Sequence, residues 1–283
     1  MKYDTKPLQQ APPLWRISAY ILMLIFAVLT IYPLAWLGYS SLKPNREIMQ
    51  NPLALPRHPT LDNYFTAWEL AGLGSALLNS AFYTIISTTI TVFISLAAAF
   101  GLAKFPFKSK NLFISAFALG LMITVHAVII PLFLVEVKLR IVNTRLGIIL
   151  PYVAFGIPLS VMIGLSFVRG IPDSLIESAE IDGARYSYIF WKMIVPLSTP
   201  VITTMAILSF LSHWNEFLFV FVFTSSASLK SLPPAITIFA GKRMVEYGLQ
   251  YAALVIGILP MFIFYLCFHS QLIKGFGEGA LKE

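Results

Sequence analysis

The chain has 283 residues, of which 58% are hydrophobic and only 12% are charged. About 25% charged residues is usual for soluble domains, so this composition excludes an ordinary soluble protein and indicates an integral membrane protein. The net charge of +7 is explained by basic residues near anionic lipid head groups, and no nucleic-acid partner is expected. The single cysteine, Cys267, lies in an apolar run, so an intramolecular disulfide is impossible.

Six apolar segments are long enough to cross a bilayer and predict an all-α protein with six transmembrane helices. They comprise residues 17–41, 70–103, 111–135, 146–168, 199–223 and 251–273. The first segment is longer than the apolar region of a signal peptide and lacks a small-residue cleavage site, so we expect it to be retained. The expected organisation is an N-terminal tail (1–16), a first helix (17–41), a loop (42–69), a five-helix core (70–273) and a C-terminal tail (274–283).

Six spans place both termini on the same side of the membrane. With the termini in the cytoplasm, the inner side carries 11 Lys and Arg residues and the outer side carries 9. Positive residues favour the cytoplasmic side. The count therefore favours cytoplasmic termini but does not decide the orientation.

The longest charge-bearing stretch between two apolar segments is residues 171–200, which lie inside the predicted core. Ser174 and Glu177 have the spacing of a capping box, which starts a helix. Gly183 is expected to end this helix, because glycine readily adopts the left-handed conformation found after the last helical residue. We expect a second helix to continue from there through Pro196 into the fifth span, so that the loop and that span form one continuous helical segment.

This loop resembles the EAA loop of permease subunits in binding-protein-dependent ABC importers. The resemblance rests on Glu177-Ser178-Ala179, Gly183 and Met193-x-Val195-Pro196. Ser178, Met193 and Val195 depart from the family pattern but preserve size or apolar character. Further stretches resemble the maltose-type second permease subunit, so the resemblance covers essentially the whole chain. They are Leu78-Asn79-Ser80, Trp214-Asn215-Glu216-Phe217 and Gly275-x-Gly277-x-Gly279-Ala280-x-Lys282.

The resemblance implies a type I ABC importer permease fold with a cytoplasmic coupling helix. In such a protein the loop is seated in a cleft of an ATPase subunit, with Glu177 as the ionic anchor, Ala179 at the close contact and Gly183 as the hinge. Pro196 marks the entry to the fifth span. The implied coupling residues are Glu177, Ser178, Ala179, Asp182, Gly183 and Pro196.

The resemblance also implies the partners and the location of the chain. The partners are a second homologous permease, two cytoplasmic ATPase subunits and an extracytoplasmic solute-binding protein. The chain lies in the cytoplasmic (inner) membrane of a bacterium or archaeon, with both termini in the cytoplasm and the loop 42–69 on the extracytoplasmic side. It has no Gly-x4-Gly-Lys-Ser/Thr phosphate loop. We therefore expect no enzymatic activity and no cofactor in this chain, with ATP and Mg bound by the ATPase subunits.

Two groups of polar residues inside the spans are candidates for the translocation pathway or its gate. Trp214, Asn215 and Glu216 fall in the outer part of the fifth span, where an acid is costly and should face protein or water. They line the pathway, or Glu216 sits at the outer interface or pairs with a neighbouring helix. Asn79 and Tyr83 begin a polar stripe, continued by Ser87, Thr91 and Ser95, along the second span. The stripe lines a pathway or serves helix packing, and the second interpretation is favoured.

The remaining alternatives have less support in the sequence. His126, His213 and His269 are scattered and have no carboxylate or thiol at metal-ligand spacing, so no metal site is expected. An ion-coupled secondary transporter requires charged residues within the membrane as coupling sites, and Glu216 alone is weak support for this function. A membrane-embedded enzyme has no nucleophile–base pair here. We therefore predict a permease subunit that forms half of the pathway for a sugar, an oligosaccharide or a related solute, which the sequence does not name.

Overall fold

The computed structural model describes residues 13–239 and 246–280, and the regular elements in these ranges are all helices. Four helices are individually long and apolar enough to cross a membrane, and six spans result if each of two bent helix pairs is counted as one. The prediction of an all-α membrane fold is thus confirmed. The predicted N-terminal tail lies largely outside the described residues. The last helix continues to Ala280, past residue 273, where the prediction ended it.

The chain forms two compact units. One contains the described residues of Met1–Leu70 and Phe239–Ile256, and the other contains those of Ala71–Ile238 and Gly257–Glu283.

The first unit is tied together by polar contacts around a short loop. Its elements are α1 (Pro13–Ser40), α2 (Asn45–Gln50), α3 (Asp62–Leu70) and the beginning of α14 (Tyr247–Ala280). The Asn63 side chain donates to the carbonyls of Ser41 and Lys43, both at 2.8 Å. Asn45 accepts a hydrogen bond from the amide of Tyr247 at 3.0 Å. These bonds satisfy backbone groups where the chain leaves α1 and where it enters α14.

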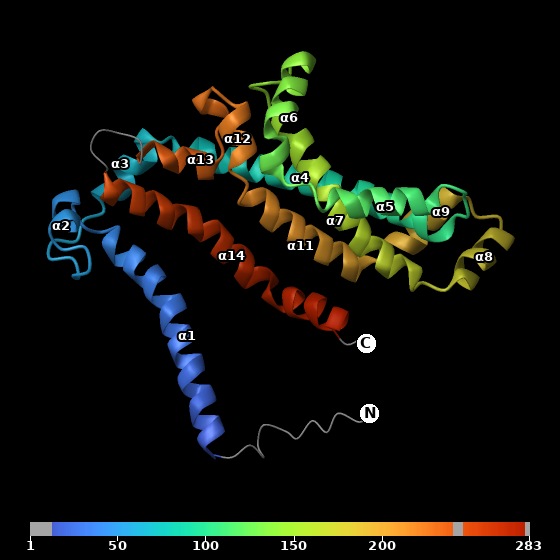
Figure 1. The fold of residues 1–283 in the computed structure, drawn as a ribbon, viewed down its shortest axis with the longest axis horizontal. Helices are drawn as coiled ribbons and strands as arrows, with labels where there is room; N and C mark the ends of the chain where they lie inside the picture. The colour runs from blue at the N-terminus through green and yellow to red at the C-terminus, as the bar shows by residue number, and fades with distance from the viewer. Residues whose placement is uncertain (1–12, 240–245, 281–283) are drawn as a thin grey trace. The chain divides into compact units, whose positions relative to one another are not determined.

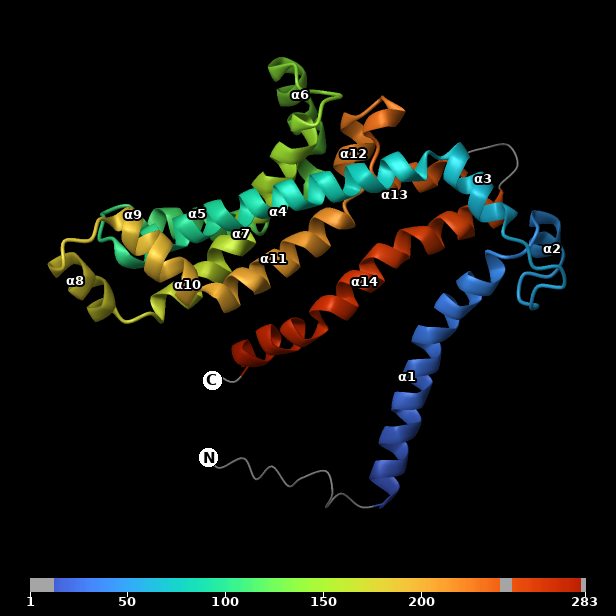
Figure 2. The same cartoon turned by 180° about the vertical axis from the view of Figure 1, so that it is seen from behind.

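The second unit has α4, α7 and α11 packed side by side, with α5 against α7 (Figure 1). The view from behind shows the same arrangement (Figure 2). Its elements up to the bend are α4 (Leu73–Lys104), α5 (Lys110–Gly120), α6 (Val125–Leu139), α7 (Leu146–Arg169), α8 (Asp173–Ile181), α9 (Tyr186–Ile189), a π-helical turn (Phe190–Ile194) and α10 (Val195–Leu197). They are followed by α11 (Thr199–Trp214), α12 (Leu218–Phe223), α13 (Leu232–Ile236) and the rest of α14.

Small residues allow the three central helices to approach closely. A Cβ atom added to Gly164 of α7 would lie 3.1 Å from Cβ of Ala99 in α4 and 3.4 Å from Sδ of Met205 in α11. Hydroxyl groups of Ser160 and Ser209 lie 3.3 Å apart across the α7–α11 contact. Small and hydroxyl side chains at such contacts are typical of helices packed within membranes, where burial of apolar surface does not by itself drive association.

The third predicted span, residues 111–135, is not a single helix. The chain forms α5 and α6 instead, bent by 105° at a short break. Thr124 before α6 is extended, with φ −83° and ψ 140°. At the end of α5, Gly120 is so close to Pro158 of α7 that an added Cβ would lie 3.0 Å from the proline Cγ. The tight α5–α7 contact thus coincides with the point at which the helix ends.

The fifth predicted span, residues 199–223, is also wrong as a single helix, and so is its continuity with the preceding loop. The segment Tyr186–Leu197 meets α11 at an angle of 77°. Pro200 has no N–H to continue the helix, and the carbonyl of Pro196 accepts the Thr199 hydroxyl at 2.7 Å instead. At its other end α11 stops at Trp214, and α12 begins at Leu218.

Candidate functional site

The helix α8 lies within the loop that carries the predicted coupling residues, and its beginning differs from the prediction. It starts at Asp173, with Pro172 at the N-cap position, and no side chain caps it there. The predicted capping box of Ser174 and Glu177 is therefore not formed. Proline before the helix leaves Ser174 inside the first turn, where it cannot take the cap position.

The end of α8 agrees with the prediction and forms a Schellman motif. The Ala184 amide donates to the carbonyl of Ala179 at 2.9 Å, and the Gly183 amide donates to that of Glu180 at 2.9 Å. Gly183 has φ +79°, which only glycine adopts without strain. Ala179 and Ala184 both pack against the same apolar cluster, as the motif usually requires.

The two faces of α8 have opposite character. Ile176 is buried, 7% exposed, in a cluster formed by the ends of α4 and α7 and by the segment that follows α8. Glu177, Ser178 and Asp182 are exposed, and Ala179 is half-buried between the two faces. The apolar side therefore fixes the helix to the transmembrane core and leaves a polar side free for a partner.

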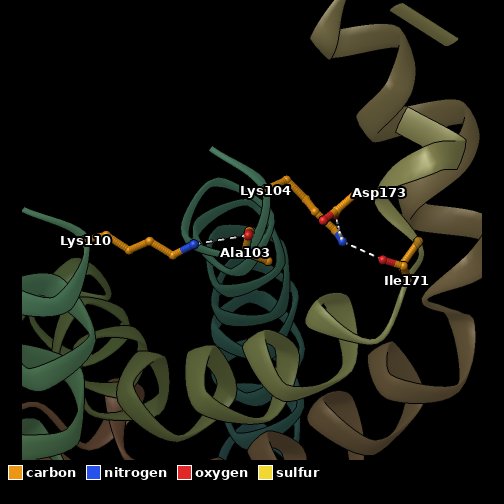
Figure 3. A network of polar contacts seen from close by, with 5 residues as sticks. All are labelled: Ala103, Lys104, Lys110, Ile171 and Asp173. Carbon is orange, nitrogen blue, oxygen red and sulfur yellow. Dashed lines mark hydrogen bonds and ion pairs between the residues drawn. The ribbon is translucent and has the colours of Figure 1, made fainter. Parts of the chain in front are cut away.

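Lys104, the last residue of α4, connects that helix to the beginning of α8 (Figure 3). Its ammonium group donates to the carbonyl of Ile171 at 2.5 Å and to the Asp173 carboxylate at 2.6 Å. The Lys104 side chain is only 5% exposed, whereas that of Asp173 is 76% exposed. Nearby, Lys110 at the start of α5 donates to the carbonyl of Ala103 at 3.2 Å. This connection could not be predicted from the sequence, because the partners are far apart in the chain.

The segment after α8 returns to the core through aromatic contacts. Phe105 meets Tyr186 edge to face, with ring centroids 4.7 Å apart, and Phe93 stacks on Trp191 at 5.5 Å. The helix then widens into one π-helical turn over Phe190–Ile194. π-Helical turns often occur at functional sites. Pro196 lies in the short helix α10 that follows, two residues before the bend at Ser198.

The polar stripe of α4 is buried inside the chain. At the end of α4 far from α8, Asn79 donates to the carbonyls of Ser228 and Lys230 at 2.7 and 3.1 Å. Tyr83 donates to the carbonyl of Leu229 at 3.0 Å. Asn79 and Tyr83 therefore hold the segment between α12 and α13. This arrangement favours packing for the stripe, and a role in the pathway stays a prediction.

The segment held by Asn79 and Tyr83 is stabilised by two further polar groups. Asn143, with φ 59°, accepts the amides of Ser225 and Ser226 at 3.0 and 2.9 Å. The Lys230 ammonium donates to the carbonyl of Thr224 at 2.5 Å near the end of α12. Burial lowers the pKa of Lys230. Asparagine tolerates a positive φ, but neither the conformation nor the partners could be read from the sequence.

His213 joins the three central helices. One ring nitrogen lies 3.1 Å from the Thr88 hydroxyl of α4, and the other lies 3.0 Å from the Tyr152 carbonyl of α7. The ring also stacks on that of Tyr152, with centroids 5.2 Å apart. The residue thus has a packing role that its position in the sequence did not indicate. Among the residues that the structure describes, no group of three potential metal ligands occurs.

Trp214 is the last residue of α11, and Asn215 and Glu216 lie in the break before α12. Trp214 is buried and stacks on Phe210, with centroids 5.8 Å apart. Asn215 is exposed, and its side chain donates to the carbonyl of Leu211 at 2.8 Å. The Glu216 carboxylate accepts the amide of Phe219 at 2.9 Å in the first turn of α12. Glu216 therefore stabilises the start of a short helix, and contact with a solute stays a prediction.

The family model described as "Binding-protein-dependent transport system inner membrane component" matches residues 8–274. This range includes α8, the bend at Ser198 and the break between α11 and α12.

Two curated bacterial proteins are similar over nearly their full length. The sulfoquinovosyl glycerol transport system permease protein SmoH of Agrobacterium fabrum is 33% identical, over 95% of this chain and 94% of its own. The trehalose transport system permease protein SugB of Mycobacterium tuberculosis is 34% identical, over 89% of this chain and 92% of its own.

A solved structure has the same fold. It belongs to a bacterial ABC transporter involved in the import of the acidic polysaccharide alginate. The TM-score is 0.80, over 91% of this chain and 96% of that chain, at 22% sequence identity.

Proposed function

Because this chain belongs to the binding-protein-dependent transport system inner membrane components, we propose that it is an ABC importer permease whose helix α8 docks on a cytoplasmic ATPase subunit. The single observation that carries the docking proposal is the division of α8 into two faces. Ile176 is buried in the core of the permease, whereas Glu177 and Asp182 point away from it into solvent. A connector that only linked two spans would have no need of an exposed acidic face on a helix anchored in this way.

The geometry supports a particular role for four of the coupling residues. Glu177 supplies the charge for an ion pair with a basic side chain of the ATPase. Ser178 donates its hydroxyl to the Ser174 carbonyl at 2.8 Å, so it adds no unpaired donor to a close contact. Half-buried Ala179 leaves room for the partner's backbone, and Gly183 lets the chain turn back toward α9.

Movement of α8 passes to the spans through the apolar cluster that Ile176 shares with Ile189, Phe190 and Ile194. The chain itself turns by 77° between Leu197 and Thr199, so it does not carry a push along one helix axis. Since packed cores transmit displacement, rotation of α8 shifts the neighbouring ends of α4 and α11.

The full transporter contains further subunits in this proposal. A second homologous permease completes the pathway, two ATPase subunits bind ATP and Mg, and a solute-binding protein delivers the solute from outside. The coupling loop and both termini then lie in the cytoplasm. The solute is a sugar, an oligosaccharide or a related compound, as the names of SmoH and SugB support.

The proposal is tested by recovery of the ATPase with the permease. The tagged permease, its companion permease and the ATPase encoded with them are produced together and purified in detergent. The wild type should retain the ATPase in stoichiometric amount, whereas Glu177→Lys should lose it. Glu69→Lys is the matched control, because it makes the same change at an exposed position on α3, in the predicted outer loop.

A second measurement separates this function from an ion-coupled transporter. Uptake of the solute should stop when cells are depleted of ATP and should persist when the ion gradients are collapsed. The opposite pattern, or equal loss of the ATPase from both variants, would show that docking through α8 does not drive transport.

A further inference from the structure

The two ends of α8 are held by different means. The Schellman motif at Gly183 closes the C-terminal end through backbone bonds. The N-terminal end has no side-chain cap from its own N-cap residue. Its position is set instead by Lys104, which reaches from α4 to the carbonyl before the helix and to the first residue in it, Asp173 (Figure 3).

The surroundings of Lys104 strengthen its contacts with Ile171 and Asp173. Its side chain is nearly fully buried, so its contacts are weakly screened on the lysine side. A cation is also favourable at the C-terminal end of a helix. The Lys104 ammonium group nevertheless donates to Ile171 and Asp173, which lie outside α4. The carbonyl of Ala103, near the end of α4, accepts a hydrogen bond from Lys110 instead. Among the described residues, Lys104–Asp173 is the only ion pair.

The helix α4 extends from this contact to the opposite end of the unit. Its 32 residues span about 48 Å at a rise of about 1.5 Å per residue. At the far end Asn79 and Tyr83 bind the segment of residues 228–230. One uninterrupted helix therefore joins the start of α8 to residues 228–230. These residues belong to the loop 224–250, which the family resemblance implies meets the solute-binding protein.

We infer that Lys104 is a positioning residue for coupling, which fixes the start of α8 to α4 so that displacement of α8 moves α4 directly. This inference rests on the proposed docking of α8 and adds a second connection beside the one through α9 and α11. It assigns Lys104 no contact with the ATPase or the solute. Lys104 acts through the orientation of α8.

The experiment uses the complete transporter in proteoliposomes and measures ATP hydrolysed per molecule of solute imported. Lys104→Gln retains a polar side chain but removes the charge, and this ratio should rise about tenfold, as expected for loss of a charge-assisted hydrogen bond. Lys104→Arg should stay within about twofold of the wild type, because it keeps a cation with several donors. Lys110→Gln is the matched control and should also stay within about twofold, since Lys110 bonds only within the α4–α5 corner.

Asp173→Asn tests the inference without risk to folding, because the side chain is exposed. It removes the ion pair and should raise the ratio in the same direction as Lys104→Gln, by a smaller factor. Retention of the ATPase should be unchanged in all four variants, since Glu177 is intact. An unchanged ratio in both Lys104→Gln and Asp173→Asn, or an equal rise in Lys110→Gln, would overturn the inference. If the wild type itself fails to retain the ATPase, it is the proposed docking that fails.

Discussion

The close packing of α7 against α4 and α11 makes a quantitative prediction at Gly156. A Cβ atom added there would lie 2.9 Å from Cγ2 of Thr91 and 3.2 Å from Nε2 of His213. Ordinary contacts between carbon atoms are about 3.5–4.0 Å, so the neighbours must move by about half an ångström or more. Thr91 is β-branched and has a stiff side chain, and His213 is held by hydrogen bonds at both ring nitrogens. Neither can move away without loss.

Gly101 is the matched control, because an added Cβ there would meet nothing within 4 Å. Both glycines lie inside helices of the second unit, so alanine gains the same helix propensity, about 1 kcal/mol, at each position. Overpacking costs about 1–3 kcal/mol. Gly156→Ala should therefore be less stable than Gly101→Ala by about 1–3 kcal/mol.

The assay is thermal unfolding of the purified permease in detergent, followed by tryptophan fluorescence. At about 2–4 °C per kcal/mol for roughly 150–250 residues, the midpoint of Gly156→Ala should lie about 2–12 °C below that of Gly101→Ala. Gly101→Ala should unfold at or above the wild-type temperature. Equal midpoints for the two variants would refute the argument that Gly156 is needed for close helix contact.

Three further predictions concern polar groups and the end of α8. His213→Ala should destabilise the permease by about 1–3 kcal/mol in the same unfolding assay, because buried partners lose hydrogen bonds, whereas exposed His269→Ala should stay within about 0.5 kcal/mol. Asn143→Ala should speed hydrogen exchange of amides 225–226 about tenfold or more, measured by mass spectrometry. Gly183→Ala should cost about 1 kcal/mol and weaken ATPase binding about fivefold in a titration, with a smaller loss for Gly183→Asn.

Features that depend on local chemistry could be predicted from the sequence. The end of α8 is an example, because the left-handed position after a helix is most often taken by glycine, which has no Cβ to strain it. The membrane fold is another, since apolar length decides whether a segment can cross a bilayer. The exposed positions of Glu177 and Asp182 follow from the pattern of polar and apolar residues within α8 and its end.

Features that depend on distant parts of the chain could not be predicted. The capping box of Ser174 and Glu177 fits the sequence, but Pro172 at the cap position and Lys104 from α4 take over the start of α8. The bend between α5 and α6 is invisible to apolar length, because a straight and a bent segment can have the same composition. The packing role of His213 could not be predicted either, because its partners Thr88 and Tyr152 are distant in the sequence and meet its two ring nitrogens only in the folded chain.

The bend at Ser198 changes how the coupling loop acts on the spans. A continuous helix would carry a push along its axis from Pro196 into α11, but two segments at 77° cannot do so. Displacement must instead pass sideways, through Ile189 and Phe190, which share a buried cluster with Met205 of α11. The ends of α4 and α11 receive this displacement together, because Lys104 holds α4 to the same helix α8. The packed cluster, rather than the covalent chain at Pro196, is therefore the part of this loop on which coupling depends.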